Sequence, residues 1–228
     1  MTVPRVIAHR GASGAERENS LAAFRKAVEL GSDGVELDIH ATADGALLVH
    51  HDPAVQGIGL IRDLPHSAFS EYKLSNGEPI PTLAQALDLL DKQDIWVEVK
   101  ALHPEWDGHL LGCLDAAPKD ACCGVHSFDH RIIARLGEQR PDLRRGVLLS
   151  SYLLDNSQIL NAVGADTLWM ETSLIDEELV QDLHEDGRDV IAWTANDERE
   201  IRRLIALGVD GICGNYPDLI RSLLHAST

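Results

Sequence analysis

The sequence predicts an α/β fold, a (β/α)8 or TIM barrel that forms a single domain over residues 1–228, with a short hairpin after its second strand. Three observations predict it. Short apolar runs alternate with amphipathic stretches of helical length along the chain. Eight strand-like runs are each followed by a helix or a connection, a pattern that requires right-handed crossovers and a mainly parallel sheet. A length of 228 residues suits one such barrel.

The alternative fold is a doubly wound open sheet. That fold usually has a glycine-rich first turn of the dinucleotide-binding type, with the spacing G-x-G-x-x-G. The first turn here has the sequence His9-Arg10-Gly11-Ala12-Ser13-Gly14, which lacks this spacing. The barrel is therefore favoured.

The first two strands come early in the chain. Residues 6–9 form an apolar run typical of a strand, and the apolar residues of 19–30 are spaced for one face of a helix. Asn19 or Ser20 is the expected cap of that helix and Gly31 its end. Residues 34–52 supply the second strand and a hairpin turned at Asp44-Gly45.

After the hairpin, residues 56–76 show no regular pattern, and Thr82 is placed to cap a helix over 83–90. The alternation then continues to the end of the chain. Further strands are expected at 95–100, 122–127, 145–149, 167–171, 190–194 and 211–213, and further helices at 109–116, 130–139, 153–163, 176–186, 197–207 and 217–224.

The hairpin carries the first candidate site residues. Glu36 and Asp38 are separated by one apolar residue, so on a strand they lie on the same face. A two-residue turn centred on Asp44-Gly45 would place His51 opposite Asp38. Two carboxylates and an imidazole together are typical of a metal site with an acid or base beside it. The alternative is a surface hairpin with scattered charges.

Polar groups follow two further strands. His9 and Arg10 end the first strand, and Glu98 and Lys100 share one face of the strand at 95–100. In barrel enzymes the catalytic groups lie at the carboxyl ends of the strands, so these side chains should meet at one barrel mouth.

Three carboxylates at this density would repel one another unless a cation lay among them. Glu36, Asp38 and Glu98 offer only oxygen ligands, which suits Mg2+ or Ca2+ better than zinc. The alternative is a structural ion-pair network that includes Arg10 and Lys100.

Histidine titrates near neutrality, so two histidines beside a metal form a plausible proton-transfer pair. His9 and His51 are the expected pair. Strand alternation turns His50 to the opposite face, and His40 is expected at the rim. The remaining histidines, among them His126, have no comparable neighbours in the sequence.

Composition limits the partners. The formal net charge is −17 and the isoelectric point about 4.9, so the electrostatic field repels nucleic acids and anionic membrane surfaces. The sequence shows no signal peptide and no apolar run long enough to span a membrane, which predicts a cytoplasmic protein without a stable membrane anchor. No cysteine pair has the C-x-x-C spacing of a zinc or redox site. Oligomeric state is not predicted.

Taken in order, these residues resemble the glycerophosphodiester phosphodiesterase family over nearly the whole chain. The matching motifs are His9-Arg10-Gly11, Glu18-Asn19, Gly31-x-Asp33, Val35-Glu36-Leu37-Asp38, Thr42-x-Asp44-Gly45, His51-Asp52-Pro53, Ile80-Pro81-Thr82-Leu83, Val97-Glu98-Val99-Lys100, Ser127-Phe128-Asp129, Trp193-Thr194-x-Asn196 and Gly208-Val209-Asp210-Gly211-Ile212.

The resemblance implies a (β/α)8 barrel, a divalent cation held by Glu36, Asp38 and Glu98, and His9 and His51 as the catalytic pair. The chain departs from the family in two places. Asn215 stands where the family usually has an acidic residue, and the segment after Pro53 is short. Neither change removes a proposed ligand, but the second leaves substrate choice open.

The function implied is hydrolysis of a glycerophosphodiester, such as glycerophosphocholine or glycerophosphoethanolamine, to sn-glycerol 3-phosphate and an alcohol. Arg10 and Lys100 would stabilise the phosphate charge. His9 would act as base and His51 as acid, although these two roles could be exchanged. Trp193, with Phe128, would pack against the glycerol backbone or simply fill the core.

Two other functions are compatible with these residues. One is a lysophospholipase D-type attack on a lysophospholipid, which needs an apolar groove at the barrel mouth. The other is a barrel that binds phosphodiesters without turnover. None of the five proposed metal and catalytic residues is missing, which favours the enzyme.

Overall fold

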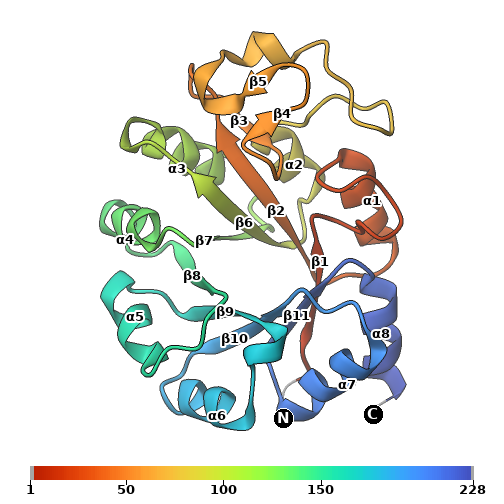
Figure 1. Cartoon of the computed structure of the whole chain (residues 1–228), viewed down its shortest axis with the longest axis vertical. Coiled ribbons are helices and arrows are strands. Elements are labelled where there is room, and N and C mark those ends of the chain that lie inside the picture. The colour runs from red at the N-terminus through yellow and green to blue at the C-terminus, as the bar shows by residue number, and fades with distance from the viewer. Residues whose placement is uncertain (1–2, 227–228) are drawn as a thin grey trace.

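A closed sheet of parallel strands forms the centre of the molecule (Figure 1), seen in a computed structural model that describes residues 3–226. Within this range the parallel strands are β1 (Arg5–His9), β2 (Gly34–Ala41), β6 (Asp94–Ala101), β7 (Cys122–Ser127), β8 (Arg144–Leu149), β9 (Thr167–Glu171), β10 (Asp189–Trp193) and β11 (Gly211–Gly214). Each pairs with the next, and β1 pairs with both β2 and β11, so the sheet closes. The predicted (β/α)8 barrel is confirmed; residues 1–2 and 227–228 of the expected domain lie outside the described part.

Helices form a ring around the sheet (Figure 1). They are α1 (Leu21–Glu29), α2 (Leu83–Leu89), α3 (Asp107–Asp115), α4 (His130–Gln139), α5 (Asn156–Val163), α6 (Glu177–Glu185), α7 (Glu198–Leu207) and α8 (Pro217–Ala226). Ser20 caps α1 through its hydroxyl, as expected. The predicted start of α5 at residue 153 is wrong, because the helix begins at Asn156, where the Asp155 carboxylate accepts a hydrogen bond from the Gln158 N–H. None of the helices in residues 3–226 is long and apolar enough to cross a membrane.

A small insertion follows β2 and lies at one end of the view in Figure 1. It contains β3 (Leu47–Val49), antiparallel to β2, the two-stranded sheet of β4 (Ala54–Val55) and β5 (Gly59–Leu60), and the short 3-10 helices η1 (Ile61–Asp63) and η2 (His66–Phe69). Its buried apolar side chains form a core of their own, made of Leu48, Val55, Ile61, Phe69, Leu74 and Ile80. The insertion is therefore packed, although its sequence shows little regular pattern.

The predicted register of the hairpin is wrong by one residue. Ile39 pairs with Val49, and the His50 N–H donates to the carbonyl of Asp38, so His50 rather than His51 lies opposite Asp38. The cause is a three-residue loop, 43–45, in which Gly45 has a φ of 81°. His51 therefore follows the end of β3 instead of belonging to its ladder.

The inside of the barrel is layered. Ionic side chains of Arg5, Asp94, Arg144 and Asp189 contact one another at the amino-terminal end. Above them lies an apolar layer made of Ile7, Trp96, Leu148, Trp169, Ile191 and Cys213. Gly146 makes room for it, since a Cβ there would lie 2.8 Å from the ring of Trp169. This layer forms the floor beneath the carboxyl ends of the strands.

Candidate active site

Three buried carboxylates lie together above this floor. Glu36 and Asp38 project from β2 and Glu98 from β6, and the strand register pairs Asp38 with Glu98. One ligand oxygen from each residue lies within 4.8 Å of the other two. Their exposed fractions are 2%, 0% and 7%. Such a cluster is stable only if positive charge balances it or some of its carboxyl groups bind a proton.

Two cations contact part of this group. The Lys100 ammonium lies 2.9 Å from Asp38 Oδ1 and 2.7 Å from Glu98 Oε1, and Arg10 Nε lies 3.0 Å from Asp38 Oδ2. Some of the ion-pair network considered from the sequence therefore exists. Glu36 is outside this network. The backbone N–H of Arg10 donates to Glu36 Oε2 at 3.0 Å, but in residues 3–226 no lysine or arginine side chain lies within 4 Å of this carboxylate.

The three carboxyl groups differ in their affinity for a proton. Burial raises the pKa of Glu36 well above its ordinary value, and the charges of Asp38 and Glu98 raise it further. Burial also raises the pKa of Glu98, to about 7, against the opposing charge of Lys100. Burial acts the same way on Asp38, but Lys100 and Arg10 outweigh it and hold the pKa of that carboxyl below its usual range.

These residues fit a divalent metal. Three carboxylates face two side-chain cations, and Glu36 lacks a cationic side chain of its own among the described residues. An all-oxygen set of this kind suits Mg2+ or Ca2+. The spacing would allow Glu36, Asp38 and Glu98 to hold one such ion together.

The turn after β1 positions Arg10. Arg10 has a φ of 55° and Gly11 a φ of 79°, two successive residues in the left-handed region. A Cβ on Gly11 would lie 2.7 Å from the backbone of Ala23, so the turn also needs the space that glycine leaves. This conformation directs the Arg10 N–H to Glu36 while its guanidinium contacts Asp38 and Glu18.

Asn19 is a site residue that the sequence did not assign. It also has a positive φ, 54°, and its side-chain amide donates to Asp38 Oδ2 at 2.7 Å. The side-chain oxygen of Asn19, Oδ1, accepts a hydrogen bond from the backbone N–H of Asp38 at 3.3 Å. Asn19 therefore fixes both the backbone and the carboxylate of Asp38. The Glu18-Asn19 motif was the only available signal, because Asp38 follows far along the chain.

His9 ends β1 beside the carboxylates and contacts Asn215. Its Nδ1 lies 2.7 Å from Asn215 Oδ1, which as an acceptor places the ring proton on Nδ1 and leaves the Nε2 lone pair free. Burial, with the charge of Arg10, lowers the pKa of His9 to about 4, against the opposing effect of the Asn215 hydrogen bond. The imidazole is therefore neutral at physiological pH.

His51 follows β3 in the insertion and lines a cavity together with Lys100. Its Nδ1 is 2.9 Å from Asp52 Oδ1, and this contact holds the pKa of Asp52 below its usual range. His40, expected at the rim, lines the same cavity as His51; it is 7% exposed, and its Nε2 lies 3.0 Å from the His51 carbonyl oxygen. His50 is buried and bonds the carbonyl of Asp52 through Nδ1. Both histidines therefore hold the backbone around His51.

His126 does have catalytic-site neighbours, contrary to the expectation from sequence. Its ring is 1% exposed, and Nε2 lies 3.8 Å from Glu36 Oε1. The ring packs against Trp169, with centroids 4.2 Å apart, and against Trp96. Burial lowers its pKa well below the usual value, so it is a neutral group beneath Glu36. Its sequence position on β7 gave no sign that β2 supplies its neighbour.

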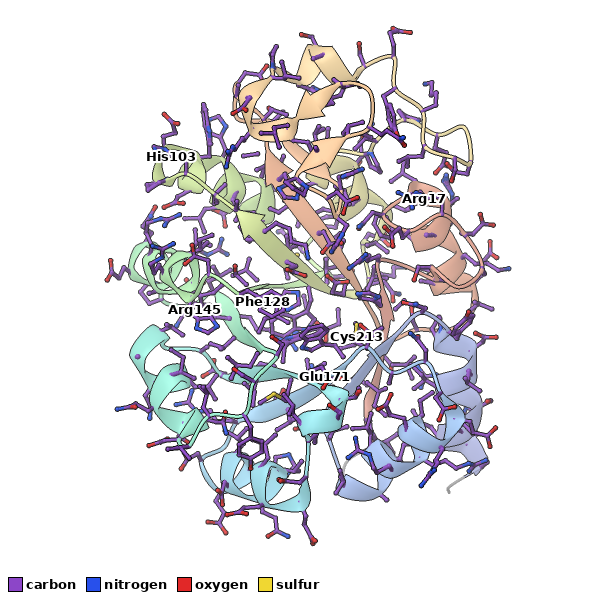
Figure 2. The ribbon with its side chains drawn as sticks, in the orientation of Figure 1. Arg17, His103, Phe128, Arg145, Glu171 and Cys213 are labelled. Atoms are coloured by element: carbon purple, nitrogen blue, oxygen red, sulfur yellow. The ribbon has the colours of Figure 1, made fainter. Side chains whose placement is uncertain are left out.

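Trp193 lies at the end of β10, on the β10 side of the mouth. Its ring packs edge to face against Phe128, with centroids 5.5 Å apart, and Phe128 is 46% exposed. Phe128, labelled in Figure 2, lies near the centre of the ring of strands. The pair forms an aromatic wall.

The closed barrel, with its charged mouth at the carboxyl ends of the strands, places the protein among the (β/α)8-barrel enzymes. The model of the Glycerophosphoryl diester phosphodiesterase family matches residues 9–219. The chain belongs to this family, whose members are phosphoric diester hydrolases. The resemblance found in the sequence is confirmed.

Three similar proteins match this chain over nearly their whole length. A glycerophosphodiester phosphodiesterase from Caldanaerobacter subterraneus subsp. tengcongensis is 30% identical, over 96% of this chain and 97% of the relative. An Oleispira antarctica phosphodiesterase, solved in complex with the product sn-glycerol-3-phosphate, has a TM-score of 0.92 at 27% identity, covering 98% of this chain and 97% of that one. A glycerophosphodiester phosphodiesterase from Parabacteroides distasonis has a TM-score of 0.89 at 26% identity, covering 99% and 98%.

Proposed function

We propose that the protein hydrolyses glycerophosphodiesters to sn-glycerol 3-phosphate and an alcohol, in a metal-dependent reaction. The observation that carries the proposal is the group of Glu36, Asp38 and Glu98, buried within 4.8 Å of one another beside Arg10 and Lys100. This arrangement can hold a cation next to a phosphate in a chain of this family. The product bound to the Oleispira antarctica phosphodiesterase supports a small phosphodiester as the substrate.

The chain's own residues divide the work. Arg10 and Lys100 bind the phosphate oxygens and stabilise their charge as the reaction proceeds. The neutral Nε2 of His9 takes the proton of the attacking water or glycerol hydroxyl, whose oxygen forms the new bond to phosphorus. If the glycerol hydroxyl attacks, the product of this step is a cyclic phosphate, and water must then break its second P–O bond to give sn-glycerol 3-phosphate. His51 gives a proton to the oxygen of the leaving alcohol as the other P–O bond breaks. Trp193 packs against the glycerol backbone.

Glu36, Asp38 and Glu98 would hold the metal, with Mg2+ and Ca2+ the candidates. When bound, a divalent cation supplies neutralising charge for a phosphate oxygen and orients the substrate. The substrates proposed are glycerophosphodiesters of the glycerophosphocholine and glycerophosphoethanolamine kind. A cytoplasmic location stays a prediction.

Metal removal tests the proposal. Release of glycerol 3-phosphate from glycerophosphocholine should stop in excess chelator and return when Mg2+ or Ca2+ is added. Independently of activity, saturating metal should raise the melting temperature by about 5–10 °C, because a ligand at a hundred times its Kd stabilises a fold by about 2.7 kcal/mol. Glu36→Gln should lose this shift, whereas Glu29→Gln, at an exposed helix position, should keep it. Full activity in excess chelator would contradict the proposal that the reaction depends on a metal.

The two histidines can be tested separately. His9→Ala and His51→Ala should each lower kcat by about 10²–10⁴-fold, whereas His66→Ala, in the exposed part of the insertion, should not. A nitrophenol leaving group needs no proton, so with such an ester the loss in His51→Ala should shrink while the loss in His9→Ala remains. If His51→Ala loses the same factor in kcat with both substrates, the assignment of His51 as the acid is contradicted. If the wild-type protein binds glycerophosphodiesters but does not hydrolyse them, the barrel is non-catalytic.

A further inference from the structure

A second cavity adjoins the mouth on the side of His51. The first cavity, of about 360 Å³, is lined by His40, Ala41, His51, Pro53, Arg62, Lys100 and Ala101. The second, of about 650 Å³, shares Ala41, Arg62 and Ala101 with it. Arg62 therefore stands at the border between them. If His51 protonates the leaving alcohol, as the proposed function requires, that alcohol departs toward this second cavity.

Four segments line the second cavity. They are residues 41–43 at the end of β2, η1 of the insertion, the connection from β6 to α3, which contains η3 (Pro104–Trp106), and the start of α4. Trp106 supplies an aromatic wall. The Trp106 ring packs closely against the hairpin turn, because a Cβ on Gly45 would lie only 2.5 Å from it. The ring also packs against the ring of His109, with centroids 4.9 Å apart.

The charged side chains that line this cavity already have polar partners. Arg62 contacts Asp63 at 3.5 Å, and Glu105 contacts His103, an imidazole that balances its charge only when protonated, at 3.1 Å. Arg131 binds Asp129 at 2.7 Å, and Arg135 binds the buried Asp107 at 2.6 Å. In a chain with a net charge of −17, the three guanidiniums and three carboxylates that line this cavity balance one another.

Paired charges favour a neutral ligand. A cationic or anionic headgroup would have to compete with these pairs for a partner, which costs little at the exposed pairs and more at Arg135 and the buried Asp107. A hydroxyl both donates and accepts, so it can bond to a guanidinium and a carboxylate that remain paired to each other. An aromatic face beside such groups suits the apolar face of a polyol.

We propose that the second cavity is a subsite for the leaving alcohol and that it selects a neutral, hydroxyl-rich headgroup such as glycerol or another polyol. The inference rests on the proposed function and deepens it. The paired charges make this cavity a hydrogen-bonding surface without net charge, and Arg62 connects it to the reacting centre.

The test compares two substrates of the intact enzyme. The wild type should have a kcat/KM about five- to tenfold higher for glycerophosphoglycerol than for glycerophosphocholine, the effect of one or two hydrogen bonds. Glu105→Gln should raise the KM for glycerophosphoglycerol several-fold, with kcat unchanged and glycerophosphocholine little affected. Arg62→Gln should lower kcat/KM several-fold more for glycerophosphoglycerol than for glycerophosphocholine. Arg202→Gln is the matched control, because Arg202 forms an exposed pair with Glu198 on α7.

The outcomes separate the two proposals. Hydrolysis of both substrates with equal kcat/KM, or a preference for the choline ester, overturns the subsite and leaves the proposed function intact. Equal losses for both substrates in Arg62→Gln also contradict selection by this cavity. Failure to hydrolyse either substrate contradicts the proposed function, and the subsite with it.

Discussion

Asn215 determines which nitrogen of His9 faces the site. Its Oδ1 accepts from Nδ1 at 2.7 Å, so the free Nε2 can accept a proton. A carboxylate in this place would do the same and would also stabilise the charged imidazolium. The neutral amide orients the ring without that electrostatic effect, which leaves burial and Arg10 to lower the pKa of His9 to about 4.

Asn215→Asp should therefore raise the pKa of His9, and the acid limb of kcat/KM against pH should move up by about one unit. The folded chain should also change its response to acid. The pKa of His9 is about 4 in the fold and 6.5 for an unperturbed histidine, so the unfolded chain binds an extra proton in this window. Stability therefore falls as the pH drops from 6.5 toward 4.

In Asn215→Asp this acid-dependent loss should be smaller, as urea unfolding at pH 4.5 and 7 would measure. The matched change Asn76→Asp, at an exposed position of the insertion, should move neither the pH profile nor the loss. An unshifted profile in Asn215→Asp would show that the amide does not act through His9.

At the scale of elements, the turn between β1 and α1 links backbone conformation to the site. Arg10 and Gly11 both have positive φ, and the turn packs against the backbone of Ala23 at the start of α1. Residues held in the left-handed region cost free energy and persist where the surrounding structure requires them. Here the conformation lets the backbone N–H of Arg10 donate to Glu36 while the Arg10 guanidinium contacts Asp38.

Gly11→Ala should lower the free energy of unfolding by about 1–3 kcal/mol and should also lower kcat/KM, because the added methyl group displaces the segment that carries Arg10. Gly77→Ala is the control: Gly77 has a similar φ of 84°, but open space surrounds its Cβ position. It should cost about 1 kcal/mol and leave activity unchanged. Thermal unfolding and kinetics of both variants measure the difference, and equal losses would contradict the role of the contact with Ala23.

Periodicity was enough to predict the barrel because strand and helix patterns are local properties of the chain. The positions of Glu36, Asp38 and Glu98 on inward faces follow from the same alternation. The hairpin register could not be predicted in this way. A three-residue loop and a two-residue turn both end in Gly45, so the sequence fits either one. The neighbours of His126 could not be predicted either, because they come from β2, β6 and β9.

At the scale of the whole molecule, chemistry and stability lie at opposite ends of the barrel. The amino-terminal end is held by Asp94, which binds both Arg5 and Arg144 and is 13% exposed in its side chain. Arg5 also reaches Asp189 at 2.7 Å. These contacts join β1, β6, β8 and β10 below the apolar layer, so they connect strands that are not all neighbours.

Asp94→Ala should therefore lower the free energy of unfolding by about 1–3 kcal/mol, since it leaves two partly buried guanidiniums with fewer partners. kcat/KM at 25 °C should not change, because the apolar layer separates this network from the catalytic end. Asp166→Ala, which removes an exposed partner of Arg188, should cost less than about 0.5 kcal/mol. Urea unfolding and kinetics test both, and a loss of activity in folded Asp94→Ala would contradict the separation.

The pairing of β1 with β11 has a consequence for biosynthesis. His9 and Asn215 are 206 positions apart, and the first strand has its last neighbour only when β11 exists. The amino terminus emerges first from the ribosome. The edge of β1 that later pairs with β11 therefore stays unpaired while the intervening units are synthesised. Catalytic competence should therefore arise late and abruptly during translation, once β11 and Asn215 have emerged, rather than growing in step with nascent chain length.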